Sequence, residues 1–216
     1  MGAIETQLIP ISELTPGAVG AIRNQVINGL VARASQELSM ALEKLVVRDV
    51  RPFSDLSMYA AGTTIATIDE WLYDATSTTA NAFTSVTGDA TMGDQRYVAI
   101  FGVRDLRKGV GVHTTAMQLD NSTDGFGAST LKAWNPPPAV VRQLRLSVGG
   151  AVKVIWDLSS VESYPDPIGF SPSAIVIPQN TTFNISYNLG GNVAGRRAWL
   201  QLIGVVVEPR GRVTSP

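Results

Sequence analysis

Apolar and polar residues alternate with a period of two through much of the C-terminal half of the chain. The clearest stretch is RQLRLSVGGAVKVIWDL, residues 142–158, where Leu144, Leu146 and Val148 alternate with polar residues ahead of a Gly-Gly pair. Alternation of this kind places the apolar side chains on one face of a strand, and glycines can adopt the positive φ angles of a two-residue turn. The stretch therefore predicts a β-hairpin.

The same pattern predicts eight strands, and their arrangement along the chain indicates the fold class. The strands are expected near residues 63, 96, 110, 140, 151, 173, 181 and 197. No helix alternates with them in a βαβ rhythm, so we expect antiparallel sheets. Eight strands with long irregular connections predict a mainly β fold, an antiparallel β-sandwich of the jelly-roll type, with an immunoglobulin-like sandwich as the alternative.

Residues 15–47 carry a helical pattern instead. Thr15 suits the N-cap of a helix that begins at Pro16, and apolar residues then recur at steps of three and four. An unbroken helix over this region would be about 48 Å long. Two alternatives stay open: part of it contacts something outside its own domain, or it breaks near Gly29 and packs flat on its own sheet. We expect an N-terminal amphipathic helical arm over residues 1–52 and the sandwich domain over residues 53–216.

Charged residues are sparse, and Arg dominates the basic ones. They make up 16% of the 216 residues, against roughly 25% in an average soluble protein. The 17 basic residues comprise 13 Arg and 4 Lys, and the formal net charge is −1. Protein interfaces are depleted in Lys and Glu and enriched in Arg, so this composition favours a surface that contacts other proteins. The net charge gives no argument for a specific nucleic-acid partner.

Residues with catalytic or metal-binding chemistry are scarce. The chain has no Cys and one His, His113, which cannot by itself supply a histidine zinc site. No Gly-x-Ser-x-Gly turn is present to form a serine triad with it. Asp120 and Asp124 match the first half of a calcium loop, but Leu131 stands where the bidentate Glu belongs. We therefore expect no enzyme activity, no catalytic residue, no metal site and no cofactor.

Three segments of the C-terminal half carry a resemblance to a known class of proteins. They are RQLRLSVGGAVKVIWDL, IVIPQNTTFNISYNL and AWLQLIGVVVEPRG. In their strands and turns they resemble the single jelly-roll coat proteins of tailless icosahedral viruses of bacteria and archaea, which enclose an internal membrane. The resemblance covers residues 95–210.

The resemblance implies a capsid protein that is made in the host cytoplasm and resides in the virion. Its mechanism would be self-assembly into an icosahedral shell, through contacts with other copies and with a second coat protein. We expect the N-terminal helix to contact the internal membrane or a neighbouring subunit. The residues expected at assembly interfaces are Val19, Ile22, Val26 and Leu30 of the arm and Arg196, Arg197, Arg210 and Arg212 at strand ends.

A binding module is the alternative function. Trp71, Trp134 and Tyr164 fall near predicted loops. Aromatic rings in such places can stack on sugar rings, as in a carbohydrate-binding or receptor-binding module of a virion or tail.

Overall fold

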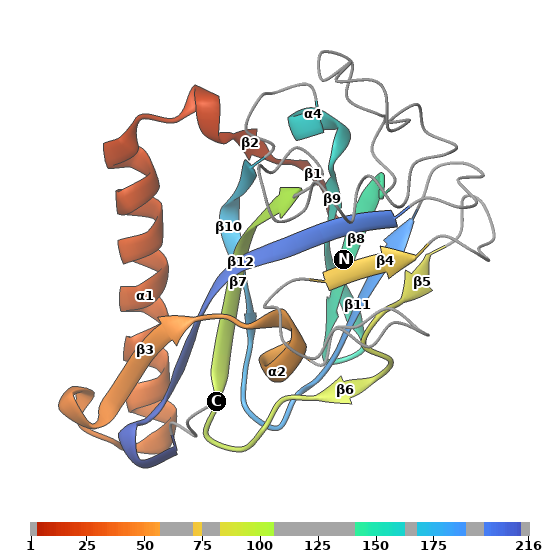
Figure 1. The fold of residues 1–216 in the computed structure, drawn as a ribbon. Helices are drawn as coiled ribbons and strands as arrows, with labels where there is room; N and C mark the ends of the chain where they lie inside the picture. Colours follow the sequence, from red (N-terminus) through yellow and green to blue (C-terminus); the bar gives the residue numbers. More distant parts are fainter. Residues whose placement is uncertain are drawn as a thin grey trace.

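The described part of the chain forms two β-sheets and one long helix (Figure 1). The structure is a computed structural model that describes residues 4–56, 71–74, 83–105, 141–162, 168–188 and 197–212. The predicted mainly β fold, with an N-terminal helix, is confirmed. The two-sheet arrangement is consistent with a β-sandwich, because a buried apolar core draws residues from both sheets.

Sheet A contains six strands in the order β1-β9-β8-β11-β5, with β6 also paired to β11. The strands are β1 (Ile4–Gln7), β5 (Thr84–Ser85), β6 (Ala90–Thr91), β8 (Gln143–Val148), β9 (Ala151–Asp157) and β11 (Thr182–Asn188). β1 runs parallel to β9, and the other pairs are antiparallel.

Sheet B also contains six strands, in the order β2-β10-β7-β12-β3, with β4 paired to β12. The strands are β2 (Ile9–Pro10), β3 (Leu45–Asp49), β4 (Trp71–Asp74), β7 (Tyr97–Asp105), β10 (Ile168–Ile177) and β12 (Arg197–Pro209). All of its pairs are antiparallel. Strands β1, β2 and β3 all come from the first 52 residues, so this part of the chain contributes to both sheets.

The antiparallel pairs are nested around the predicted hairpin. β8 pairs with β9, β7 with β10, β5 and β6 with β11, and β3 with β12. Among the described strands, each successive pair lies farther out along the chain, and β4 also pairs with β12 in the outermost set. Successive pairs alternate between the two sheets. At the centre, Gly149 and Gly150 have φ angles of 61° and 75°, which confirms the predicted Gly-Gly turn.

Helix α1 (Pro16–Leu38) begins as predicted but ends nine residues early. The Thr15 hydroxyl accepts a hydrogen bond from the Ala18 N–H at 3.2 Å, so the predicted N-cap is confirmed. Ser39, with a left-handed φ of 51°, ends the helix. The prediction of helix up to residue 47 is wrong, because Leu45–Asp49 alternate between the two faces of sheet B and pair with β12.

The 23-residue helix packs flat on the outer face of sheet B (Figure 1). At about 1.5 Å per residue it extends for about 34 Å, and it does not break at Gly29. Leu30 and Ala34 are buried against Tyr97 and Phe101 of β7. Of the two alternatives, the structure therefore supports the helix that covers its own sheet.

Short helices and turns connect these elements. The short helices among the described residues are η1 (Ile11–Glu13), η2 (Leu42–Lys44), α2 (Pro52–Leu56), α4 (Ser159–Glu162) and η4 (Arg210–Arg212).

Most of the strands predicted from the sequence are present in the structure. The strands expected near residues 96, 140, 151, 173, 181 and 197 are confirmed as β7 to β12. Residues 72–95 are mostly small and polar and predict one long loop, but they contain residues 72–74 of β4 together with β5 and β6. The expected strand near 110 lies outside the described residues, as do residues 63–70 of another.

Candidate functional site

The apolar residues predicted at an assembly interface lie on the side of α1 that faces sheet B. Leu30 is 2% exposed, and Val19, Ile22 and Val26 are partly buried in the same apolar layer. In this fold they attach α1 to its own sheet. Their role between subunits stays a prediction.

The predicted arginines lie at or near the two ends of β12. Arg197 is the first residue of β12, and Arg210 and Arg212 belong to η4, where Arg210 is exposed. Arg196 lies outside the described residues. The two ends of a 13-residue strand are far apart, so these arginines do not form one cluster.

The other candidate residues lie mostly outside the described ranges. Trp71 begins β4, which pairs with β12 on the side opposite β7. Trp134, Tyr164, His113 and the Asp120–Asp124 segment lie outside the described residues.

The outward face of α1 is poor in charge and rich in small residues. The 23-residue helix contains only Arg23, Arg33 and Glu37 as charged residues. A side chain added at Gly20 or Gly29 would meet no atom within 4 Å, so neither glycine is required by the packing of this chain. Each costs about 1 kcal/mol of helix stability relative to Ala. This face is suited to close contact with another surface.

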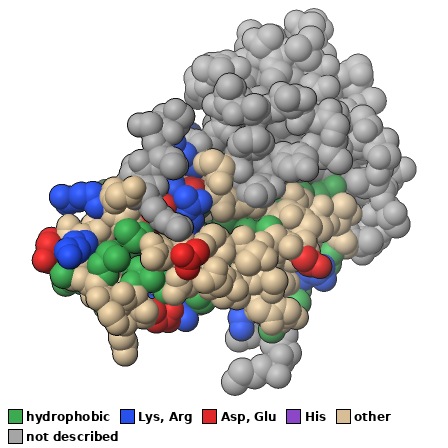
Figure 2. Space-filling model, turned by 90° about the horizontal axis from the view of Figure 1, so that it is seen from below, with side chains coloured by type: hydrophobic (Ala, Val, Ile, Leu, Met, Phe, Trp, Pro, Cys, Tyr) green, Lys and Arg blue, Asp and Glu red, His purple; other side chains and the backbone are tan. Residues whose placement is uncertain are grey.

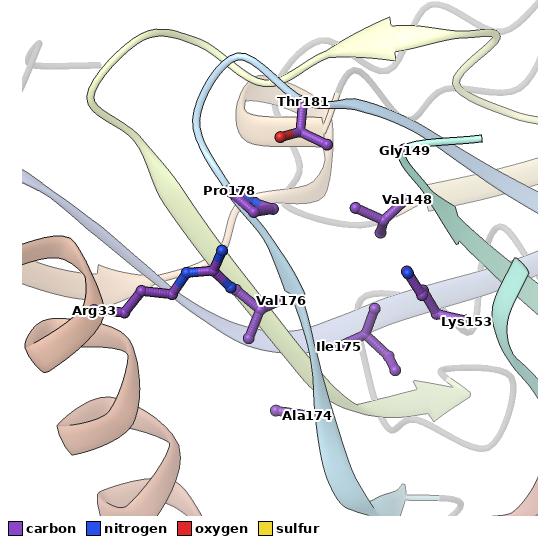
Figure 3. Close-up of a pocket in the computed structure, with 9 residues that line it drawn as sticks. All are labelled: Arg33, Val148, Gly149, Lys153, Ala174, Ile175, Val176, Pro178 and Thr181. Atoms are coloured by element: carbon purple, nitrogen blue, oxygen red, sulfur yellow. The ribbon is translucent and has the colours of Figure 1, made fainter. Parts of the chain in front are cut away.

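A groove of about 570 Å³ follows the edge of β10, between α1 and the β8–β9 hairpin (Figure 3). Ile175 packs against the core between the sheets, whereas Val176 packs against the layer beneath α1. Because these neighbours point to opposite faces of β10, the groove lies along the strand's edge. Arg33 and Lys153 stand on opposite sides of it in Figure 3, with Ile175 and Val176 between them.

The lining of the groove favours an acidic group that lies beside an apolar surface. Its remaining residues are Val148, Gly149, Ala174, Pro178 and Thr181. The floor is apolar, and the two cations can receive a carboxylate. None of the nine lining residues is a carboxylate or a histidine.

A three-residue hydrogen-bond network joins α1 to β7 beside this groove. Glu37 accepts a bond from Arg33 Nε at 2.7 Å and one from the Tyr97 hydroxyl at 2.9 Å. These bonds, the one from Arg33 first, hold the pKa of Glu37 below its usual range. Burial and the bond to Glu37 raise the pKa of Tyr97 to about 12. The network thus keeps Glu37 ionised and Tyr97 protonated, and it anchors the C-terminal half of α1.

A second network buries two carboxylates between two arginines. Arg48 donates to both oxygens of Asp55 at 2.6 Å and to Glu208 at 2.9 Å. Arg96 donates to Glu208 at 3.0 Å and lies 3.4 Å from Asp55. Both carboxylate side chains are only 2% exposed. Hydrogen bonds to Asp55, and then to Glu208, raise the pKa of Arg48 above its usual value. The network fixes β3, α2, β12 and the entry to β7 to one another.

Neither network was predicted from the sequence. Glu208 was the available signal, because it is a lone charged residue after a run of three valines in the last strand. A charge in such a strand is expected to need a buried partner. Its partners come from positions 48 and 96, and no local spacing links those positions to it.

The described residues offer no metal-binding cluster and no membrane-spanning helix, and no known relative matches the chain. Within the described ranges, no group of three or more His, Cys, Asp or Glu residues is placed to hold a metal ion. None of the helices described is long and apolar enough to cross a membrane. Protein-family models, curated proteins and solved structures gave no match to this chain.

Proposed function

We propose that this chain is a capsid protein with a jelly-roll fold, which assembles with copies of itself and with a second coat protein into an icosahedral shell. The observation that carries the proposal is the nested pairing of its strands. A jelly roll arises when an antiparallel ribbon of eight strands rolls into two sheets, and viral capsid domains use this architecture.

The strand order supports the jelly roll in detail. In sheet B the order is β3-β12-β7-β10. The outermost pair of the ribbon, β3 and β12, therefore lies beside the pair of β7 and β10. Sheet A places β5 and β6 beside β11, and the β8–β9 hairpin beyond that pair. An immunoglobulin-like sandwich does not alternate nested pairs between its sheets in this way.

Lectin domains and cupins share the jelly roll, so the surface must distinguish the functions. Low charge and a preference for Arg over Lys are properties of protein–protein contacts. The outward face of α1 shares that low charge, and it keeps two glycines that the fold itself does not need. These features support a subunit surrounded by neighbours.

Between the two partners considered for the helical arm, a neighbouring subunit has more support than a membrane. A helix that lies on a membrane turns its apolar face toward the lipid. The apolar side of α1 covers sheet B, and its outward residues are small or polar. We therefore propose that α1 meets another protein through its outward face.

Electron microscopy of the purified full-length chain tests this function. We expect closed or partly closed particles, alone or after addition of a candidate second coat protein from the same source. Asn28→Lys adds a charge to an exposed position of α1, so it should reduce particle formation while the unfolding temperature stays unchanged. A chain that forms no particle under any of these conditions would contradict the proposal.

A further inference from the structure

We propose that β3 is a self-pairing edge: two copies of this chain associate about a two-fold axis by antiparallel pairing of β3 with β3, centred on Val47. This goes beyond the proposed function, because such a dimer forms whether or not the copies go on to close a shell. Closed two-fold contacts of this isologous kind are the commonest in homo-oligomers.

The other three sheet edges, as far as the described residues form them, are short or interrupted. β1, the edge strand beside β9, has four residues, and the outer side of β11 pairs with the two-residue strands β5 and β6. The β10 edge is partly covered by β2, interrupted by a bulge between Phe170 and Ile175, and followed by Pro178. β3 has no proline or bulge, and among the described residues it pairs only with β12. An edge strand without a proline or a bulge can accept another strand.

The backbone register determines which groups of β3 point outward. The Val50 N–H donates to the Gly204 carbonyl at 3.0 Å, and these residues continue the β3–β12 pairing. In an antiparallel ladder, alternate residues bond the same neighbour. Val46 and Arg48 therefore bond β12, whereas the N–H and C=O of Val47 point to the open edge.

The residues two positions away from Val47 face the same edge. The N–H of Leu45 already donates to the Leu42 carbonyl, and the carbonyl of Asp49 accepts a bond from Arg48 at 3.3 Å. Pairing centred on Val47 would join its own N–H and C=O to those of the second copy. It would also join the Asp49 N–H to the Leu45 carbonyl, in both directions.

Two exposed apolar side chains lie at or next to β3. Among the described residues, Leu42 at 58% and Val47 at 36% are the large hydrophobic residues that remain exposed. Val47 is the central residue of β3, and Leu42 begins η2, directly before β3. Figure 2 shows hydrophobic side chains gathered at the end of the molecule that holds the C-terminal end of α1 and the start of β3. Pairing centred on Val47 would place its side chain against its own copy, because directly opposed residues lie close together.

Charge selects this register over its neighbours. Successive residues of β3 point to opposite faces of the sheet, and residues that oppose each other across the pair must point to the same face. The two-fold axis must therefore pass through a residue of β3 and not between two residues. An axis at Val46 would place Arg48 opposite Lys44, and an axis at Arg48 would place it opposite itself. An axis at Val47 places no like charges opposite each other. Beyond the ends of β3 it brings the exposed Glu43 of one copy near the exposed Arg51 of the other. Like charges directly opposed are destabilising, so Val47 is the favoured centre.

Sedimentation equilibrium of edge variants tests the dimer. Val47→Pro removes the central outward donor, and because that N–H does not bond β12, the ladder within the chain is retained. Val47→Lys places two ammonium groups against each other. Each should weaken dimerisation of the full chain by about tenfold or more. Ser173→Lys, at an exposed position on the β10 edge, is the matched control and should leave dimerisation unchanged.

A single engineered thiol gives an independent test. The chain has no Cys, so Val47→Cys introduces the only thiol, and its two copies would meet at the axis. Mild oxidation should give a disulfide-linked dimer from Val47→Cys in much higher yield than from Ser173→Cys. Equal yields from the two variants, or equal association of wild type and Val47→Lys, would overturn the inference.

These results separate the inference from the proposed function. Particles that still assemble from Val47→Lys without the β3 contact would overturn the inference and leave the capsid proposal in place. A dimer that depends on Val47 but never builds a particle would support the inference and count against the capsid proposal.

Discussion

Replacement of Arg48 by Met should destabilise the subunit far more than the same replacement at Arg23. Both arginines pair with an aspartate, Arg48 with Asp55 at 2.6 Å and Arg23 with Asp49 at 3.0 Å. They differ in burial, because the Arg23 and Asp49 side chains are 48% and 77% exposed. The comparison therefore sets a buried ion-pair network against a single exposed ion pair.

The magnitude follows from what Arg48→Met leaves behind. Asp55 and Glu208, each 2% exposed, would face Arg96 as their remaining ionic partner in the network. Removal of one partner from a buried ion pair costs about 3–5 kcal/mol. Arg48 is itself 23% exposed, so we expect the lower end, about 3 kcal/mol. An exposed pair contributes about 0.2–1 kcal/mol, which sets the expected loss for Arg23→Met below about 1 kcal/mol.

Urea unfolding measured by tryptophan fluorescence gives both values, because Trp156 is fully buried in the core. With a urea dependence of about 2–3 kcal/mol/M, Arg48→Met should lower the midpoint by about 1 M or more. Adding Asp55→Asn and Glu208→Gln to Arg48→Met should recover part of the loss, since it removes the buried negative charges. Equal losses for Arg48→Met and Arg23→Met would refute the reasoning.

Three further predictions follow from the packing and the titrating groups. Gly20→Ala and Gly29→Ala should each raise the free energy of unfolding by about 0.5–1 kcal/mol, as measured by urea unfolding, because each has open space and a helical backbone. A loss of stability at either site would contradict this. Gly204→Ala should destabilise by about 1–3 kcal/mol, because its Cβ would lie 2.5 Å from a backbone oxygen of β7; an unchanged melting temperature would contradict it. The pKa of Tyr97 is raised above its unfolded value, so its contribution to stability is complete below about pH 10 and is lost as pH rises toward about 12. Unfolding midpoints of wild type and Tyr97→Phe across that range should converge with rising pH, and a constant difference would contradict the prediction.

Local patterns sufficed for the elements that the sequence predicted correctly. The hairpin of β8 and β9 was predictable because each strand is long enough to show alternation and the Gly-Gly turn has one main use. The start of α1 was predictable from Thr15 and Pro16, which cap a helix whatever it packs against.

The incorrect predictions arose where a pattern was short or coincidental. Leu42 and Leu45 happen to continue the helical spacing of α1, which concealed the β-branched run of β3. β5 and β6 have two residues each, too few to show any period. These strands exist because β11 offers them an edge, and that is a tertiary effect.

The candidate surfaces depend on contacts between distant segments. The groove brings together Arg33, Lys153 and β10, and the buried network unites positions 48, 55, 96 and 208. Only the order of strands within the sheets makes these groups neighbours. The low charge and the abundance of Arg could be read directly from the composition. They led to the prediction of a surface that contacts other proteins.

Light scattering of the purified full-length chain over a range of concentrations gives its molar mass, and this measurement tests the proposed self-assembly directly. A self-assembling capsid protein should show a mass that climbs from small oligomers to large particles as its copies contact one another. A mass that stays at the 23.0 kDa of a single chain over the whole range would contradict it.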